Sequence, residues 1–233
     1  MEITTDVIEY LQWGPVTLNA TILFTWIVMA ILAGGSWIVT RKISTGMHMS
    51  RGQNLLEVLL SAIKDQIREI SQQEKVDKYL PFVGTLFIFI AVSNVLSIIP
   101  GFKSPTGSLS TTAALALCVF VAVPLYGIWE QGIKGYLKRY LQPSILMLPF
   151  NIIGEFSRTL TLAMRLYGNI MSGSMIVAIL VSLVPLFVPL IMQVFGLLIG
   201  LIQAYVFSIL AMVYIAAATE VSEGQVNQAN EAA

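Results

Sequence analysis

The sequence of 233 residues has little charge, one histidine and one cysteine. Charged residues make up 11% of it, against about a quarter in ordinary soluble domains. Its 13 basic and 13 acidic residues cancel, and no basic cluster of the kind that binds nucleic acid is present. Cys118 and His48 alone cannot build a disulfide or a soft-metal site that needs several ligands. The motifs of serine hydrolases, zinc proteases and P-loop enzymes are also missing, so we expect no cofactor, no metal and no nucleic-acid partner.

The sequence is instead rich in apolar residues, which form 56% of the chain and give a mean hydropathy of +0.80. A helix needs about 20 apolar residues to cross a bilayer, and several stretches reach that length. We therefore predict an all-α integral membrane protein, a single membrane domain with five transmembrane helices and one amphipathic surface helix. The predicted spans are residues 20–40, 80–100, 109–129, 146–184 and 186–218.

The last two spans come from one apolar region that prolines divide. Pro185 and Pro189 disfavour helix at the residue before each of them. Each resulting helix is longer than the ~20 residues that a bilayer requires. We therefore expect both helices to be strongly tilted or partly unwound.

Residues 41–79 are polar overall but carry an apolar stripe. From Leu55 to Ile70 apolar residues recur near the helical period, and charged residues such as Lys64 and Arg68 occupy much of the other face. This pattern indicates a helix lying at the membrane surface, or a solvated helix packed on a partner subunit. The chain is completed by an N-terminal segment, residues 1–19, and a polar tail, residues 219–233.

The distribution of Lys and Arg predicts the orientation. Seven of them lie in residues 41–79 and three in residues 130–142, whereas residues 101–108 hold one and the N-terminal segment holds none. By the positive-inside rule the N-terminus is outside and the C-terminus is cytoplasmic. The first residues lack the basic stretch of a cleavable signal. We expect a multi-pass protein of a bacterial inner membrane or a thylakoid membrane.

Three ionisable residues interrupt the apolar helix predicted at 146–184. Charges within a bilayer are rare and usually functional, because burying them costs several kcal/mol. Glu155 and Arg158 are three residues apart and are able to pair, either as part of a pathway or as a structural salt bridge. Arg165 has no acidic residue within four positions, and an arginine does not lose its proton in proteins. It therefore needs a distant counter-ion or water, unless it is a buried structural arginine.

A polar strip continues from Arg165 along the same helix. Gly168 and Asn169 border its face one turn on, and Ser172 and Ser174 extend the strip toward the predicted outer side. The glycine would let solvent or another helix approach the arginine. Packing of small residues alone is the alternative explanation of this strip.

The last predicted helix has its own polar face. Gln203 and Tyr214 are eleven residues apart, about three turns, and so share a face. Gly196, Gly200 and Ala204 form a stripe of small residues suited to close helix contact. Gln203 would organise water or an arginine, or would simply make an interhelical hydrogen bond.

The segment Arg165-Leu166-Tyr167-Gly168-Asn169 resembles the RLFGN signature of subunit a of F-type ATP synthases, the ATPase A chain family of the F0 sector. The resemblance extends over about residues 20–220. Other stretches similar to the family are Pro149 to Glu155, Ser157-Arg158, Gln203-Ala204, Leu210 to Tyr214, Ser93-Asn94 and Pro105-Thr106.

The resemblance implies a subunit that is not catalytic alone and forms two ion half-channels against a rotating ring of c subunits. The two long helices would lie tilted against that ring, with peripheral-stalk b subunits and other synthase subunits as further partners. Arg165 would be the stator charge that separates the half-channels, with Gln203 beside it. The remaining ion-pathway residues would be Asn169, Glu155, Arg158, Ser172, Ser174, Tyr214 and Glu220, although Glu220 also fits a frayed tail.

The sequence departs from the family at two positions, since Ser174 and Gly196 are non-titratable where many members carry a titratable group. Water would then carry protons in the outer half-channel, and a sodium-translocating form of the same subunit is the alternative. A secondary transporter that binds an anion at Arg165 predicts broken helices and an internal repeat, and neither is apparent. A purely structural stalk anchor leaves the unpaired arginine unexplained.

Overall fold

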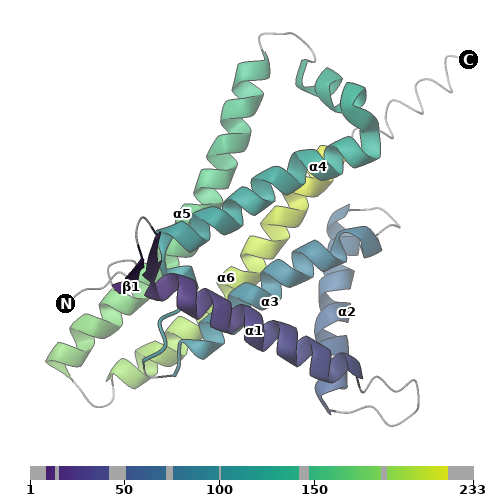
Figure 1. Ribbon diagram of the computed structural model, residues 1–233. Helices are drawn as coiled ribbons and strands as arrows, with labels where there is room; N and C mark the ends of the chain where they lie inside the picture. The colour runs from purple at the N-terminus through teal and green to yellow at the C-terminus, as the bar shows by residue number, and fades with distance from the viewer. Residues whose placement is uncertain are drawn as a thin grey trace, which may run out of the picture.

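Apolar helices run back and forth between two ends of the molecule, and one amphipathic helix crosses the others near one end (Figure 1). The computed structural model describes residues 9–13, 16–41, 51–71, 76–99, 101–141, 147–184 and 188–219. The apolar helices are α1 (Ala20–Arg41), α3 (Leu80–Leu96), α4 (Leu109–Leu141), α5 (Met147–Leu183) and α6 (Val188–Thr219), and the crossing helix is α2 (Arg51–Ser71). Short 3-10 turns, η2 (Val76–Lys78) and η3 (Pro105–Gly107), precede α3 and α4.

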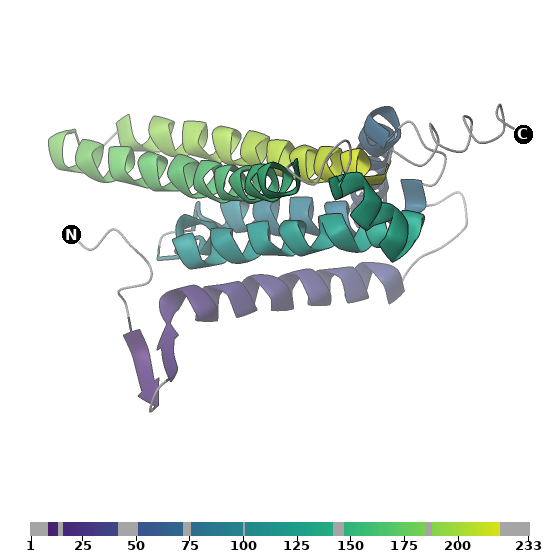
Figure 2. The same ribbon diagram turned by 90° about the horizontal axis from the view of Figure 1, so that it is seen from above.

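The helices are stacked in layers. Figure 2 shows α5 beside α6, then α3 with α4, and α1 on the outside. In both views α2 lies at the end opposite the N-terminal strands. The α5–α6 pair therefore forms one face of the molecule and α1 the opposite face.

The all-helical membrane architecture is confirmed in outline. Four helices, α1, α4, α5 and α6, are long and apolar enough to cross a bilayer. The helix α3 has 17 residues, which is about 26 Å at the usual rise, slightly less than the ~30 Å hydrocarbon core. The predicted count of five full-length spans is therefore not established by helix length alone.

Two segments differ from the sequence prediction. Strands β1 (Glu9–Trp13) and β2 (Val16–Asn19) form an antiparallel hairpin ahead of α1, in the N-terminal segment for which the sequence predicted no secondary structure. The polar stretch after the predicted span 109–129 is also helical as far as Leu141, in a second segment of α4 that follows a kink at Gly132. Gly132 in α4 has φ 73° and ψ 163°, a conformation that glycine adopts readily. The chain therefore bends at Gly132, and the helix resumes after it.

The core of the molecule is built around α6. Phe207, Met212 and Ile215 of this helix are fully buried, as are Ile90 of α3 and Leu166 of α5. In a bilayer the lipid chains are as apolar as this core, so apolar burial drives helix association less than it does in water. Close packing and interhelical hydrogen bonds must therefore supply much of the specificity.

One such hydrogen bond joins α3 to α6. The amide nitrogen Nδ2 of Asn94, which is buried, donates to the backbone carbonyl of Gly200 at 2.8 Å. Thr106 Oγ1 in turn donates to Asn94 Oδ1 at 3.3 Å. A Cβ at position 200 would lie 3.0 Å from Cγ and Nδ2 of Asn94, so glycine is what allows this approach. The predicted stripe of small residues is thus used at Gly200, whereas nothing lies within 4 Å of a Cβ at Gly196.

We predict that Gly200→Ala destabilises the packing of α3 on α6 by roughly 1–3 kcal/mol, because the added methyl displaces the Asn94 amide. The measurement is the melting temperature of the protein in detergent, followed by tryptophan fluorescence. Gly196→Ala, one turn earlier on the same helix and with open space around it, is the matched control. Equal melting temperatures for the two variants would contradict the argument.

Candidate functional site

Arg165 is presented on the outside of α5. Its neighbours Leu162, Ala163 and Leu166 are buried in the core, while Arg165 itself is exposed. Within the part of the chain that the structure describes, no carboxylate lies within ion-pair distance of its guanidinium and no hydrogen bond reaches it. The chain therefore carries a permanent cation that its own described residues leave unneutralised, as the sequence predicts.

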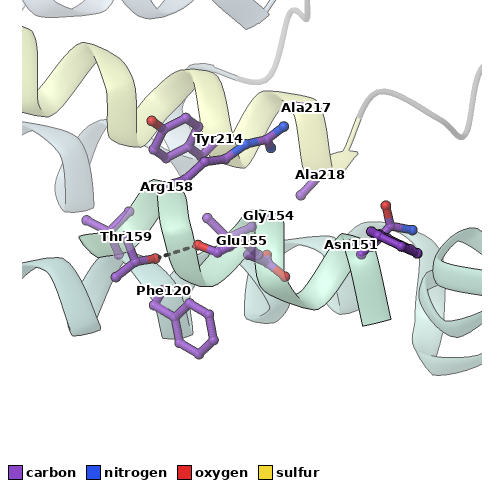
Figure 3. A pocket seen from close by; sticks show the side chains of 12 residues that line it. Phe120, Asn151, Gly154, Glu155, Arg158, Thr159, Tyr214, Ala217 and Ala218 are labelled. Atoms are coloured by element: carbon purple, nitrogen blue, oxygen red, sulfur yellow. Dashed lines mark hydrogen bonds between the residues drawn. The ribbon is translucent and has the colours of Figure 1, made fainter. Parts of the chain in front are cut away.

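A pocket of about 430 Å³ lies two turns before Arg165, where α4, α5 and α6 meet. It brings together three of the predicted site residues, Glu155, Arg158 and Tyr214 (Figure 3). Arg158 reaches from α5 toward α6, and its guanidinium carbon lies 5.8 Å from the centre of the Tyr214 ring, within cation–π range. We call this cavity the inner pocket, because it lies at the C-terminal end of α6, which the sequence predicts to be cytoplasmic.

Other polar groups of the inner pocket were not singled out from the sequence. Thr159 Oγ1 donates to the backbone carbonyl of Glu155 at 3.0 Å (Figure 3), and Asn151 lines the wall one turn away. Both lie four residues from Glu155 in the sequence, a spacing that places them on its helix face. The pairing of Glu155 with Arg158 stays a prediction.

A second pocket of about 530 Å³ lies on the other side of Arg165, and we call it the outer pocket. It gathers the predicted residues Asn169, Ser172 and Ser174. The hydroxyl groups of Ser172 and Ser174 donate to backbone carbonyls of their own helix, Asn169 O at 3.1 Å and Met171 O at 2.8 Å. The remaining polar lining residues are Asn94, Ser97, Lys103, Ser104 and Gln193.

The outer pocket has no carboxyl group among its described lining residues. Among the described lining residues Lys103 is the one ionisable side chain, and the sequence did not predict its place near Asn169, because the two residues are far apart in the chain. Gly196 also lines this pocket. A path through the outer pocket would therefore run through water past uncharged polar groups and one cationic side chain, that of Lys103.

Gln203 is buried, with 8% of its surface exposed. Among the described residues, its side-chain amide has no hydrogen-bond partner, so the plain interhelical bond considered from sequence is not observed. Leaving such a group unsatisfied costs about 1–3 kcal/mol, which favours a water molecule or another polar group at this place. Its nearness to Arg165 stays a prediction, and Glu220 lies outside the described residues.

These features define a class of protein. The chain is a polytopic helical membrane protein with an arginine on one long helix that no described residue neutralises, and with a polar pocket on either side of it along that helix. Intramembrane charges of this kind mark the paths of ions and protons. The site is thus typical of a membrane protein that moves charge.

Comparison with known proteins gives the family. The family model described as ATP synthase A chain matches residues 22–216. ATP synthase subunit a 2 of Acaryochloris marina is 63% identical over 223 residues, covering 96% of this chain and 95% of that protein. ATP synthase subunit a 1 of Crocosphaera subtropica is 61% identical, covering 93% and 94%, and ATP synthase subunit a of Albidiferax ferrireducens is 57% identical, covering 94% of each. The chain belongs to the ATP synthase A chain family, and it is an ion-translocating subunit of the F0 sector that is not catalytic by itself.

We predict that the aromatic ring of Tyr214 matters to the inner pocket more than its hydroxyl does. The ring holds the Arg158 guanidinium by a contact worth roughly 0.5–2 kcal/mol. Tyr214→Phe keeps the ring and should leave ATP-driven ion uptake close to that of the parent, whereas Tyr214→Leu should lower it severalfold. The measurement is uptake by inverted vesicles, normalised to the amount of assembled complex. Equal loss in both variants would assign the effect to the hydroxyl instead.

Proposed function

We propose that this chain forms the two ion half-channels of an F-type ATP synthase and couples proton translocation to the rotation of a ring of c subunits. The observation that carries the proposal is the position of Arg165 on α5, between the outer and inner pockets in the order of the chain. An ion enters one pocket, neutralises a carboxylate of the ring, travels with the ring and leaves by the other pocket. The same cycle in reverse accompanies ATP hydrolysis.

Arg165 supplies the electrostatic step of this cycle. A cation at about 4 Å from a carboxylate attracts it by roughly 4 kcal/mol at an effective dielectric constant of ~20. This attraction stabilises the charged form of the carboxylate, lowers its pKa and so expels its proton. Because an arginine stays charged at all relevant pH values, the step does not depend on the protonation of Arg165.

The same charge also prevents leakage between the pockets. A proton or sodium ion crossing directly from one pocket to the other would have to pass the permanent cation of Arg165. In a medium of low dielectric constant that repulsion is as large as the attraction to the carboxylate. Ions would therefore cross only when the ring carries them around.

The face formed by α5 and α6 suits a partner in the membrane. Of the apolar stretch of α5, 6% is buried within the chain, the smallest share among the four long helices. Bulky side chains on both helices point outward, with Leu160 and Met164 on α5 and Phe195, Leu198 and Ile202 on α6. This supports a ring of c subunits against α5 and α6, with lipid and the peripheral-stalk b subunits elsewhere.

The lining of the outer pocket is relevant to which ion, proton or sodium, the protein carries. Apart from Lys103 its described lining is uncharged, and it holds no carboxyl or imidazole group to relay protons, so water is the proposed carrier. The same lining would equally let a hydrated sodium ion pass, which keeps a sodium-translocating enzyme as the second candidate. Ion choice would then be made by the carboxylate site of the c subunits.

The proposed orientation places the hairpin β1–β2 outside and α2 on the cytoplasmic side. The basic residues Lys64, Arg68 and Lys78 lie in or just after α2, and Lys134 lies near the end of α4. Figure 2 has these segments at the end opposite the hairpin. Such an arrangement follows the positive-inside rule in a bacterial inner membrane or a thylakoid membrane.

We predict that Arg165→Ala abolishes coupled pumping while the complex still assembles, because no other cation replaces its charge. Arg165→Lys keeps a charge but loses the planar guanidinium and should recover only part of the activity. The measurement is ATP-driven ion uptake by inverted vesicles that contain the whole complex. Normal coupled pumping by Arg165→Ala would refute the proposed mechanism.

The coupling ion is tested in the same vesicles by following proton and sodium uptake in parallel. Proton coupling predicts acidification that a protonophore collapses. Sodium coupling predicts sodium uptake that persists or rises with the protonophore, since it removes the opposing potential. The first result would support water as the carrier in the outer pocket, and the second would select the alternative.

A further inference from the structure

The C-terminal end of α6 is completed by a side chain from α4. The last four carbonyls of an α-helix have no partner within the helix. The amide nitrogen Nε2 of Gln131 donates to the carbonyl oxygens of Ala218 and Thr219 at 3.0 and 3.3 Å. Thr219 Oγ1 lies 3.2 and 3.0 Å from the carbonyl oxygens of Ile215 and Ala216, to which it donates. The last two carbonyls of α6 thus receive donors from Gln131 of another helix, while the single proton of the Thr219 hydroxyl is shared between the carbonyls of Ile215 and Ala216.

The bend at Gly132 lies directly after Gln131, and the chain folds back on itself there. Its positive φ turns the end of α4, so that the ring of Tyr136 lies against Gly127. A Cβ at position 127 would lie 2.7 Å from Cε2 of Tyr136 and 3.5 Å from the carbonyl oxygen of Ala218. Gly127, Gln131 and Tyr136 therefore lie together at the end of α6.

A salt bridge joins Glu130, the residue before Gln131 in α4, to Lys78 of the turn η2. Lys78 Nζ lies 2.7 Å from Glu130 Oε1, and this hydrogen bond raises the pKa of Lys78 above its ordinary value. The ammonium group is also 6.0 Å from the centre of the Trp129 ring. Gln131 thus lies in a stretch of α4 that contacts both η2 and the end of α6.

The end of α6 that Gln131 holds is also a wall of the inner pocket. Ala217 and Ala218 line that pocket together with Glu155, Arg158 and Tyr214. We infer that Gln131 is a positioning residue that fixes the end of α6 and so sets the access of ions to the inner pocket. The part of this inference that concerns ions rests on the proposed function, whereas the placement of α6 does not.

The test uses the assembled complex in inverted vesicles and a thiol probe at the pocket wall. Cys118 is first replaced by serine to remove the native thiol of this chain, and Ala217→Cys then introduces one at the pocket. The labelling rate with a water-soluble maleimide reports access to the pocket, and ATP-driven ion uptake per assembled complex reports function. Gln131→Leu removes the donor at similar volume, while Gln131→Arg keeps donors and places a favourable cation at the helix C-terminus.

We expect Gln131→Leu to change the labelling rate by about fivefold, the factor that one hydrogen bond of usual net strength represents, and to lower ion uptake. Gln131→Arg should stay near the parent in both measurements. Ile133→Ala, at an exposed position two residues away, is the control and should change neither.

Three results would overturn the inference. Labelling of Gln131→Leu at the parent rate would show that the residue does not place α6, and equal behaviour of the Leu and Arg variants would show that the donor is not the cause. Altered labelling with normal ion uptake would show that this wall does not govern ion access. Arg165→Ala in the same background separates the two proposals, because normal pumping by that variant would refute the proposed function while its labelling rate stays that of the parent.

Discussion

The structure depends on the hydrogen bonds that hold α6 in place. Within a lipid bilayer the hydrophobic effect contributes little to helix association. In water, burying a side chain such as Phe207 would contribute about 1.5–3 kcal/mol by itself, but lipid reduces that term. The polar contacts of α6 are therefore the ones that select its position. Asn94 of α3 bonds the carbonyl of Gly200, and Gln131 of α4 bonds the carbonyl of Ala218. Tyr205 of α6 donates to Gln66 of α2 at 2.5 Å, so three other helices hold this one by hydrogen bonds.

With these anchors in place, the described residues leave the outward face of α5 uncovered. The helix is fixed by a narrow buried strip, including Leu162 and Leu166, and most of its other side chains are exposed. In an isolated chain such a surface would meet lipid, which is acceptable for leucine and methionine but not for Arg165. The arginine is thus the residue that makes a polar or charged partner necessary on this face.

Sequence reasoning identified the features that depend on one stretch of chain. The hydropathy of α5 and α6 predicted two long helices, and the absence of an acidic neighbour predicted that Arg165 would be unpaired. It did not predict contacts between distant residues, such as that of Asn94 with Gly200, 106 positions apart. The bend at Gly132 was also missed, because a glycine in a polar stretch is as compatible with a loop as with a kinked helix.

Arg165 has no partner among the described residues because of where α5 places it. Ala163 and Leu166, which are close to Arg165 in the sequence, are buried. Rotating α5 to bring the guanidinium toward the inner pocket would remove these two side chains from the core. The carboxylate of Glu155 is ten residues away along the same helix, about 15 Å at the usual rise, which is beyond the reach of a salt bridge. A counter-ion for Arg165 must therefore come from outside the described part of the chain. A carboxylate on a moving partner would neutralise the charge of Arg165 only while it is close to the guanidinium. A stator requires such a charge, because a permanent ion pair would hold the partner in one position.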